Sequence, residues 1–363
     1  MPPHLDALGS RMAKLIPKLV LEAAPIAMLA GAGVLALRGA EPKDRAGRRG
    51  AERAGAAARS PFQIPLRGWK QIAARTRSEF ADDQIPMIAA GVSFYTLLAI
   101  FPGLAAFVAL YGLFADIGTV QHHLHILSFV LPGSALKFFG DEMVRMAEGQ
   151  KGGLSLTFIV GLVTSLWSAN GAVKALITGL NIAYEEHDKR SFIRKTMISM
   201  AFTLGLLAFG MAAIAVLGAG PAIEAYLGHH AAFMWNLVSW PALLVAMGLG
   251  IALLYRFAPS RDPASFEWLS PGSAAALILW IAVSALFSLY VGNFAHYDKT
   301  YGSLGAVVGF MMWNWLTNVV ILAGAELNSE VEAQTAVDTT TGAAKPMGLR
   351  GARAADTLGA ARG

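Results

Sequence analysis

The sequence contains no cysteine among its 363 residues, and only 15% of the residues are charged. Without cysteine the chain has no disulfide framework and no metal or redox site built on thiolates. Ordinary soluble domains carry about 25% charged residues, so the scarcity of charge argues against that class. The phosphate-binding pattern G-x-x-x-x-G-K-[ST] is also missing, as are H-E-x-x-H and G-x-S-x-G. We therefore expect no ATP-driven step, no catalytic residues and no cofactor.

Hydrophobic residues are abundant and make up 55% of the chain. Most charges lie outside six long apolar stretches, each long enough to cross a bilayer as a helix. The short alternating segments that are typical of transmembrane strands are not seen. The sequence thus predicts an all-α, polytopic membrane helix bundle with six core helices, at about 86–114, 153–186, 196–218, 236–257, 272–295 and 303–327.

Composition divides the chain into a variable N-terminal segment (1–60), a membrane domain (61–332) and a disordered tail (333–363). The apolar stretch 19–37 leaves three alternatives open: an extra membrane helix, an uncleaved signal-like segment or an interfacial helix. Residues 38–60 are rich in glycine, alanine and arginine and have no apolar period. They are typical of a disordered basic linker.

Lysine and arginine are concentrated in segments 59–85, 184–196 and 256–270 and in the tail. By the positive-inside rule these segments are cytoplasmic, and six helices place the C-terminus inside as well. The net charge of +5 follows from this distribution, so we expect no nucleic-acid partner. Residues 66–83 place Trp69 and other apolar residues on one helical face and cations on the rest. This pattern predicts a helix lying on anionic lipid.

The second predicted helix carries polar residues at Ser168, Asn170, Lys174, Thr178 and Asn181. A polar stripe on a membrane helix should face other helices or a wet cavity rather than lipid. Lys174 reaches a depth similar to that of Glu326 in the sixth helix, so we hypothesise that the two form a contact or share one inward-facing cavity. The alternative is that Lys174 extends to the membrane interface and that Glu326 simply ends its helix.

The first and sixth predicted helices carry features of helix packing. Pro102 predicts a kink in the first helix, because proline cannot donate to the carbonyl of the preceding turn. Asn314 and Asn318 share one face of the sixth helix, where they either line a path or hydrogen-bond neighbouring helices. Close approach of another backbone is predicted at three glycines of the same segment, Gly302, Gly305 and Gly309.

Three blocks of sequence carry a family resemblance: DQIPMIAAGVSFYTLLAIFPGL (83–104), LWSANGAVKALITGLNIAYEE (166–186) and YGSLGAVVGFMMWNWLTNVVILAGAELNSE (301–330). They resemble the YihY/BrkB family of bacterial inner-membrane proteins over about 65–332. The resemblance implies six membrane helices, a place in the inner membrane and no settled activity. Some members are called virulence or serum-resistance factors, and the family once carried the name ribonuclease BN.

A metal-dependent nuclease needs closely spaced histidine and aspartate ligands. No H-x-H-x-D-H run occurs in the sequence. The cluster of His122, His123 and His125 lies in a predicted outer loop, with no acidic residue closer than Asp116. We therefore reject the ribonuclease interpretation and expect no metal site.

We expect the protein to translocate or handle a lipid-like or amphiphilic envelope substrate among membrane lipids. The support is the polar residues of the second and sixth helices, the kinked first helix and surface helices on both sides. One surface helix is the segment 66–83, and the other is a short amphipathic helix expected in the outer loop, where Pro132, Gly133 and Ser134 precede spaced apolar residues up to Met146. The alternative is a non-transporting envelope scaffold, assembly or virulence-associated protein whose polar faces bind partner helices. A lipid-modifying enzyme with a bound metal would need an acidic cluster, which the sequence does not offer. Homo-oligomerisation stays open.

Overall fold

The computed structural model describes residues 55–112, 156–294 and 304–359. Its described part is helical and contains a single isolated β-bridge, between Ala264 and Thr340. This confirms the all-α prediction. Six long helices form the bundle: α4 (Ile85–Gly112), α7 (Leu156–Ala183), α8 (Phe192–Gly218), α10 (His229–Phe257), α11 (Phe266–Phe294) and α13 (Leu304–Glu332).

Five of the described helices are individually long and apolar enough to cross a membrane, namely α7, α8, α10, α11 and α13. A sixth span results when the short helix α3 (Leu66–Asp82) and α4 are counted together. The six long helices match the six predicted stretches, and Pro102 lies inside α4 as expected. The kink at Pro102 stays a prediction.

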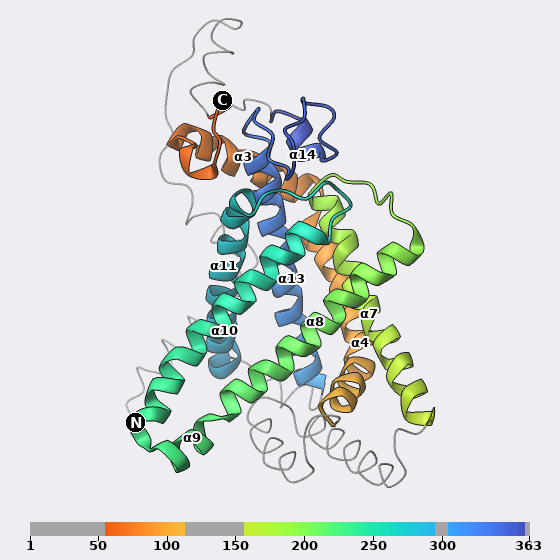
Figure 1. Cartoon of the computed structure of the whole chain (residues 1–363), viewed down its shortest axis with the longest axis vertical. Helices are drawn as coiled ribbons and strands as arrows, with labels where there is room; N and C mark the ends of the chain where they lie inside the picture. The colour runs from red at the N-terminus through yellow and green to blue at the C-terminus, as the bar shows by residue number, and fades with distance from the viewer. Residues whose placement is uncertain (1–54, 113–155, 295–303, 360–363) are drawn as a thin grey trace, which may run out of the picture.

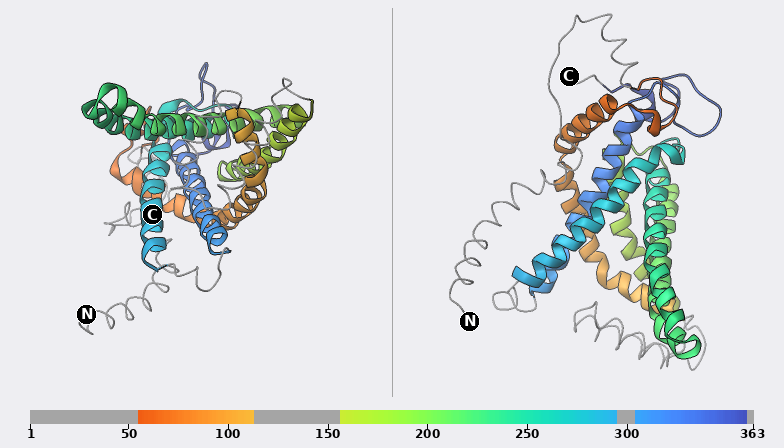
Figure 2. Two further views of the ribbon diagram at one scale, coloured as in Figure 1. Left: turned by 90° about the horizontal axis from the view of Figure 1, so that it is seen from below. Right: turned by 90° about the vertical axis from the view of Figure 1, so that its left-hand side faces the viewer.

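Helix α13 occupies the centre of the bundle and contacts α11, α4, α3 and α7 (Figure 1). The main hydrophobic core surrounds its second half. Fully buried side chains from each neighbouring helix meet there, among them Ile85, Ile177, Leu180, Tyr255, Leu269 and Leu322. The helices lie close together at the end that carries α3 and the short helix α14 (Arg353–Asp356), and they spread apart toward the opposite end (Figures 1 and 2). We call the first of these the tail end.

A bend of 58° separates α3 from α4. Gln84 makes the bend with a φ of 53°, a left-handed conformation that is uncommon for a residue other than glycine. The predicted surface helix is present, but its apolar side packs on protein: Ile72 belongs to a cluster with Trp268 and Val331. Arg75, which we expected to face anionic lipid, is buried against α13. The bend therefore folds α3 back over the tail end of the bundle.

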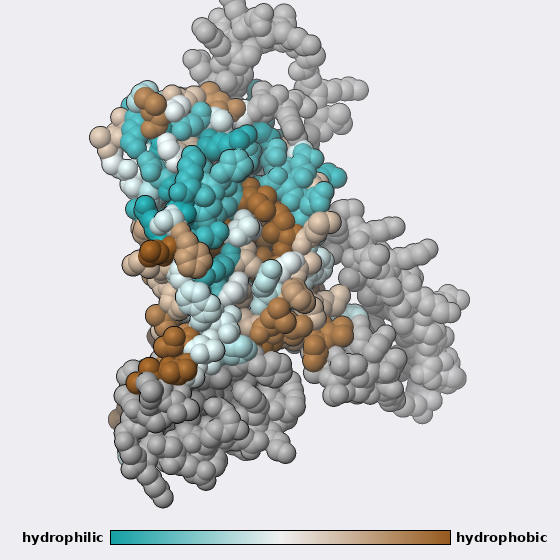
Figure 3. All heavy atoms as spheres, turned by 90° about the vertical axis from the view of Figure 1, so that its right-hand side faces the viewer, coloured by the Kyte–Doolittle hydropathy of each residue, from teal (hydrophilic) through white to brown (hydrophobic). Residues whose placement is uncertain are grey.

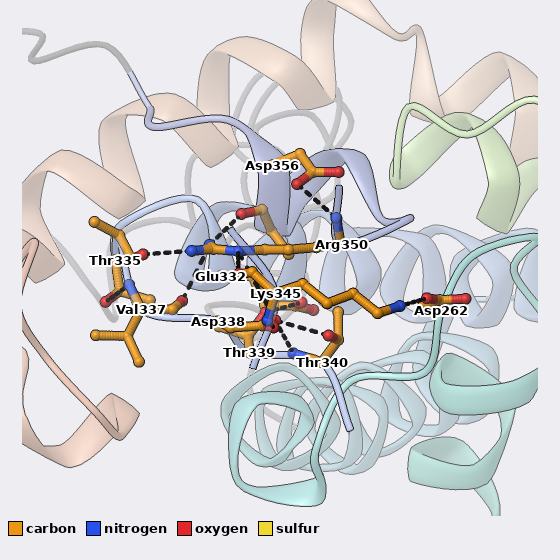
Figure 4. Close-up of polar contacts among 12 residues, drawn as sticks. Asp262, Glu332, Thr335, Val337, Asp338, Thr339, Thr340, Lys345, Arg350 and Asp356 are labelled. Carbon is orange, nitrogen blue, oxygen red and sulfur yellow. Dashed lines mark hydrogen bonds and ion pairs between the residues drawn. The ribbon is translucent and has the colours of Figure 1, made fainter. Parts of the chain in front are cut away.

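The tail is ordered over 333–359, which corrects the prediction of disorder. The Arg350 guanidinium donates to the carbonyls of Ala336 at 2.7 Å and Ala355 at 2.6 Å, and so holds two turns of the tail together. Lys345 reaches Asp262 in the loop between α10 and α11 at 2.7 Å (Figure 4). The sequence missed this order because polar contacts to backbone carbonyls, rather than a periodic apolar face, hold the segment together.

The last residues of the predicted basic linker are folded as well. Thr335 donates to the carbonyl of Ala58 at 2.7 Å, and the amide of Ala336 donates to the carbonyl of Ala56 at 2.8 Å. Two further helical segments are short, η1 (Pro61–Gln63) and α9 (Gly220–Leu227). The apolar stretch 19–37 and the cluster of His122, His123 and His125 lie outside the described residues.

Candidate functional site

Helix α7 has a buried side and an exposed side, and both carry polar residues. Thr164, Ser168 and Thr178 are exposed, and Lys174 beside them is partly exposed. We call these four residues the polar stripe. Figure 3 faces the side on which α7 lies and shows hydrophilic residues near the tail end, with weakly polar residues between apolar patches farther away. Of the five polar residues that we expected to face inward, Asn170 and Asn181 are buried, whereas Ser168 and Thr178 are exposed and Lys174 is partly exposed.

Lys174 lies beside aromatic rings on the outer side of the bundle. Its ammonium nitrogen is 4.8 Å from the centroid of Trp167 and 5.3 Å from that of Phe192 at the start of α8. Both rings are largely exposed, Trp167 at 53% and Phe192 at 69%. No ion pair joins Lys174 to Glu326, so the hypothesised contact is not formed within the described residues. Glu326 does not end its helix either, since α13 continues to Glu332.

The asparagines of the predicted polar path are buried and join helices. Asn170 accepts a hydrogen bond of 3.0 Å from Thr203 on α8, and Asn181 accepts one of 2.7 Å from the amide of Ser260. Asn318 donates to Ser93 on α4 at 3.0 Å. Asn314 is buried and its amide nitrogen has no partner among the described residues. Three of the four thus favour the packing alternative over a lined path.

Close backbone approach occurs at glycines other than those we expected. No described atom lies within 4 Å of a Cβ built on Gly309. Gly302 and the surroundings of Gly305 lie outside the described residues. The tight crossing joins α11 to α13: a Cβ on Gly272 would lie 2.1 Å from the carbonyl oxygen of Gly324. Sequence reasoning could have considered Gly324, since it lies in the quoted family block.

A second polar region lies where α3 packs against α13. Arg75 and Glu79 are four residues apart on α3, and Asp83 follows at the same spacing as the C-cap of that helix. Glu326 and Glu330 are four apart on α13, so each set shares one helical face. We call these five residues the α3–α13 ladder. Arg75 forms an ion pair with Glu330 and also donates to the Glu330 carbonyl at 3.1 Å.

Asp83 and Glu326 form the other end of the ladder. Glu326 is only 2% exposed. Its Oε1 atom has no hydrogen-bond partner among the described residues. Sequence reasoning found Glu326 but missed Arg75 and Asp83. The signal that could have found them is that charged residues recur at every fourth position, both in the segment 75–83 and in the segment 326–330.

Two further carboxylates at the tail end, the buried Glu332 and the exposed Glu185, are paired with arginine. Glu332 forms an ion pair of 2.6 Å with Arg261, whose guanidinium lies 4.3 Å from the ring of Tyr184. Burial raises the pKa of the Tyr184 phenol above its ordinary value, so this group is neutral. Glu185 pairs with Arg353 at 2.6 Å.

The described residues contain no group of three or more histidine, aspartate or glutamate side chains placed to hold a metal ion. The described part of the chain therefore offers hydrogen-bonding groups, the Lys174 ammonium group within a candidate span and buried carboxyl groups. These are means of binding and moving polar groups.

Comparison with known proteins adds a family. Residues 76–347 match the family described as virulence factor BrkB. A Bacillus subtilis protein named as ribonuclease-like is 30% identical over 246 residues, covering 66% of this chain and 87% of the relative. No solved structure matches this chain.

Proteins described only as UPF0761 membrane proteins are also similar. One from Aromatoleum aromaticum is 26% identical and covers 73% of this chain and 65% of the relative. One from Neisseria meningitidis serogroup B is 27% identical, and the match covers 69% of this chain and 61% of the relative. The chain thus spans less than two thirds of the length of these two relatives. Given the family match over most of the bundle and the several candidate spans, the chain belongs to the BrkB family of multi-pass membrane proteins.

Proposed function

We propose that the protein moves an amphiphilic, lipid-like molecule through the membrane, with the polar end of that molecule travelling along the polar stripe of α7. The observation that carries the proposal is the exposure of Thr164, Ser168 and Thr178 on a helix long and apolar enough to span a bilayer. Polar groups facing hydrocarbon are unfavourable unless something polar contacts them. The hydroxyls of Thr164 and Thr178 already donate to the carbonyls of Val160 and Lys174, at 2.8 and 3.0 Å. A lipid headgroup beside the stripe would therefore chiefly supply a polar contact to Ser168 and Lys174.

Lys174 suggests the charge of the substrate. An ammonium group within a membrane span is costly unless it is paired, and no described carboxylate forms an ion pair with Lys174. Its position over Trp167 and Phe192 leaves it on the outer side of the bundle. A phosphate or carboxylate headgroup would form a charge-assisted hydrogen bond with it. We therefore favour an anionic amphiphile over a neutral one.

The test uses the full chain in vesicles that contain a fluorescent anionic phospholipid. A quencher added outside reports how much labelled lipid crosses from the inner to the outer leaflet. The wild-type chain should speed this crossing over protein-free vesicles, Lys174→Ala should reduce the gain at least about threefold, and Lys174→Arg should retain most of it. Lys195→Ala is the matched control, since Lys195 lies outside the stripe and pairs with Asp188 at 3.1 Å.

The alternative is a scaffold whose polar stripe binds a partner helix, including one from a second copy of the chain. It rests on the same exposed residues, because small polar side chains also join membrane helices. Cysteine placed at Thr178 would then form cross-links between copies with high efficiency, and lipid crossing would equal that of protein-free vesicles. That pair of results would overturn the transport proposal.

A further inference from the structure

Helix α3 turns one side to the bundle and the opposite side outward. Its buried residues are Gly68, Ile72 and Arg75. Six of its exposed residues fall within one arc of about 100° on the other side, at about 100° per residue. We call this set the outer face of α3: Leu66, Arg67, Lys70, Ala74, Arg77 and Ala81. Asp82 is also exposed but lies outside the arc, where it accepts from Ser78 at 3.1 Å.

The outer face of α3 holds three cations and no acidic residue. No carboxylate of the described residues forms an ion pair with Arg67, Lys70 or Arg77. Other cations at the tail end are taken up by acids of the protein, as Arg261 is by Glu332 and Lys345 is by Asp262. The charge of the outer face is therefore left for a partner outside the described part of the chain.

The bend between α3 and α4 places this charge at the boundary of the membrane. The two helices qualify as one bent span, with an angle of 58° between them, and Figure 1 shows α3 at an angle to the long helices. Arg77 precedes Ile85 by eight residues, or about 12 Å of helix. For an α4 axis along the membrane normal, Arg77 then lies about 6 Å beyond the start of α4. The polar layer on each side of the hydrocarbon core is about 5–8 Å thick, so Arg77 lies within it.

The other two cations lie farther out but still near the headgroups. Arg67 precedes Ile85 by eighteen residues, which by the same projection places it about 14 Å beyond the start of α4. The outer edge of the headgroups is then within about a Debye length, which is about 8 Å at physiological ionic strength. All three cations thus lie where the potential of anionic headgroups acts on them.

The composition of the outer face favours lipid headgroups over a protein partner. Between its cations lie only the small side chains of Ala74 and Ala81, and its single large apolar residue, Leu66, lies at the start of the helix. The centre of a protein interface is typically rich in aromatic residues and methionine, which this face lacks. Lipid phosphates need no such centre, because arginine and lysine bind them through charge-assisted hydrogen bonds.

We propose that the outer face of α3 is a binding surface for anionic phospholipid headgroups at the tail end of the bundle. Arg67, Lys70 and Arg77 supply the attraction, which is about fivefold in binding for each cation near an anionic surface. The buried side of α3 meanwhile holds the helix on α13 through Arg75. The surface lies on a different helix from the polar stripe, so the proposal stands whether or not the protein moves lipid.

The test measures which lipid lies beside the outer face. A cysteine at Ala74 carries a fluorophore, and the full chain is placed in phosphatidylcholine vesicles with a small fraction of nitroxide-labelled lipid. At low salt, labelled phosphatidylglycerol should quench the fluorophore at least about threefold more than labelled phosphatidylcholine. The preference should vanish in 1 M salt, where the Debye length is about 3 Å.

Substitutions show which cations cause the preference. The triple variant Arg67→Gln, Lys70→Gln, Arg77→Gln should lose it, and the salt series on the wild-type chain remains decisive if that variant does not fold. Lys345→Gln is the matched control and should keep the preference, since Lys345 is already paired with Asp262. Lys174→Ala should also keep it, which separates this surface from the polar stripe.

Equal quenching by the two labelled lipids at low salt would overturn the proposal, as would a preference that the folded triple variant retains. Absence of quenching by either lipid would also overturn it and would indicate that the outer face of α3 meets a soluble acidic partner instead.

Discussion

The ammonium group of Lys174 lies 4.8 Å from the centroid of the Trp167 ring, on the outer side of α7. A cation over an indole face at an exposed site gains about 0.5–1 kcal/mol. The contact also orients Lys174 away from the bundle interior. Lys174 and Glu326, which the sequence placed at one depth, therefore belong to two separate regions of the protein.

Charge swapping tests that separation. Lys174→Glu should lower the yield of folded protein slightly, because Lys174 has no ion pair to lose within the described residues. Glu326→Lys should lower it strongly, because it places a longer, charged side chain at a position of α13 that is only 2% exposed. The double swap should show the sum of the two losses, as expected for sites that do not interact.

The readout is the monodisperse fraction after extraction in mild detergent. Arg261 and Glu332 provide the positive control, since their ion pair is 2.6 Å long and a double swap there should recover part of the loss. Recovery of folded protein by the Lys174 and Glu326 double swap would show that these two residues do interact.

The hydrogen bond between Asn318 and Ser93 should couple α13 to α4. Interhelical hydrogen bonds in membranes contribute about 0.6 kcal/mol on average and up to about 1.7 kcal/mol. A double-mutant cycle with Asn318→Leu and Ser93→Ala should therefore give a coupling energy in that range, measured by reversible unfolding in detergent. A coupling energy of zero would mean that Asn318 does not join the two helices.

Gly324 should not tolerate a side chain. A Cβ at Gly324 would lie 2.5 Å from the Tyr255 hydroxyl and 2.8 Å from the carbonyl oxygen of Gly272, and that backbone atom cannot move aside. Gly324→Ala should cost at least about 1–3 kcal/mol through overpacking. Gly309→Ala, on the same helix with no described atom within 4 Å, is the matched control and should unfold like the wild-type chain. Equal unfolding temperatures of the two variants would contradict the close crossing.

Arg350 should be essential for the order of the tail. Its side chain is buried and satisfies the carbonyls of Ala336 and Ala355, each of which would cost about 1–3 kcal/mol if left unpaired. Arg350→Ala should raise amide hydrogen exchange in 336–356 by at least about a hundredfold. Arg353→Ala is the control: Arg353 is largely exposed and its ion pair contributes at most about 1 kcal/mol. Unchanged exchange in Arg350→Ala would contradict this role.

Asp338 should make the tail sensitive to acid. Although burial acts in the opposite direction, hydrogen bonds from the amide of Lys345 and from Thr340 lower the pKa of Asp338 below its ordinary value of 3.8. A lowered pKa stabilises the fold above the ordinary value, and that stabilisation is lost as the pH falls through the folded-state pKa. Asp338→Asn should therefore destabilise the tail at neutral pH and have little effect near pH 2, as seen by hydrogen exchange. An effect that did not vary with pH would contradict the assignment.

The six long helices could be predicted from sequence because each is a continuous apolar run with charges at its ends. The apolar pattern did not show which polar residues of each helix are buried and which are exposed. Helical periodicity grouped Lys174 with Asn181, yet Asn181 is buried beneath the loop at Ser260 while Lys174 faces outward. Two polar residues on neighbouring arcs of one helix have different surroundings, and only the packing of the other helices decides which is covered.

The ladder and the tail escaped prediction for another reason. Arg75 and Glu330 are 255 positions apart in the sequence, so no local sequence pattern predicts their ion pair. The bend at Gln84 brings them together. Pro86 marks the start of α4, but it does not show in which direction α3 folds back. Glu326 could be singled out from the sequence as an intramembrane charge, whereas Asp83 lies in a segment typical of an ordinary acidic helix end.

Cysteine accessibility along α7 tests the central claim, which is that the polar stripe faces a path open to polar groups. The chain has no native cysteine, so each introduced thiol is the sole target. Single cysteines at Thr164, Ser168 and Thr178 should react with a membrane-impermeant thiol reagent in lipid vesicles, whereas cysteines at Ile177 and Leu180 should not. Unreactive thiols at all three stripe positions would mean that the stripe is sealed from polar groups and would contradict the account.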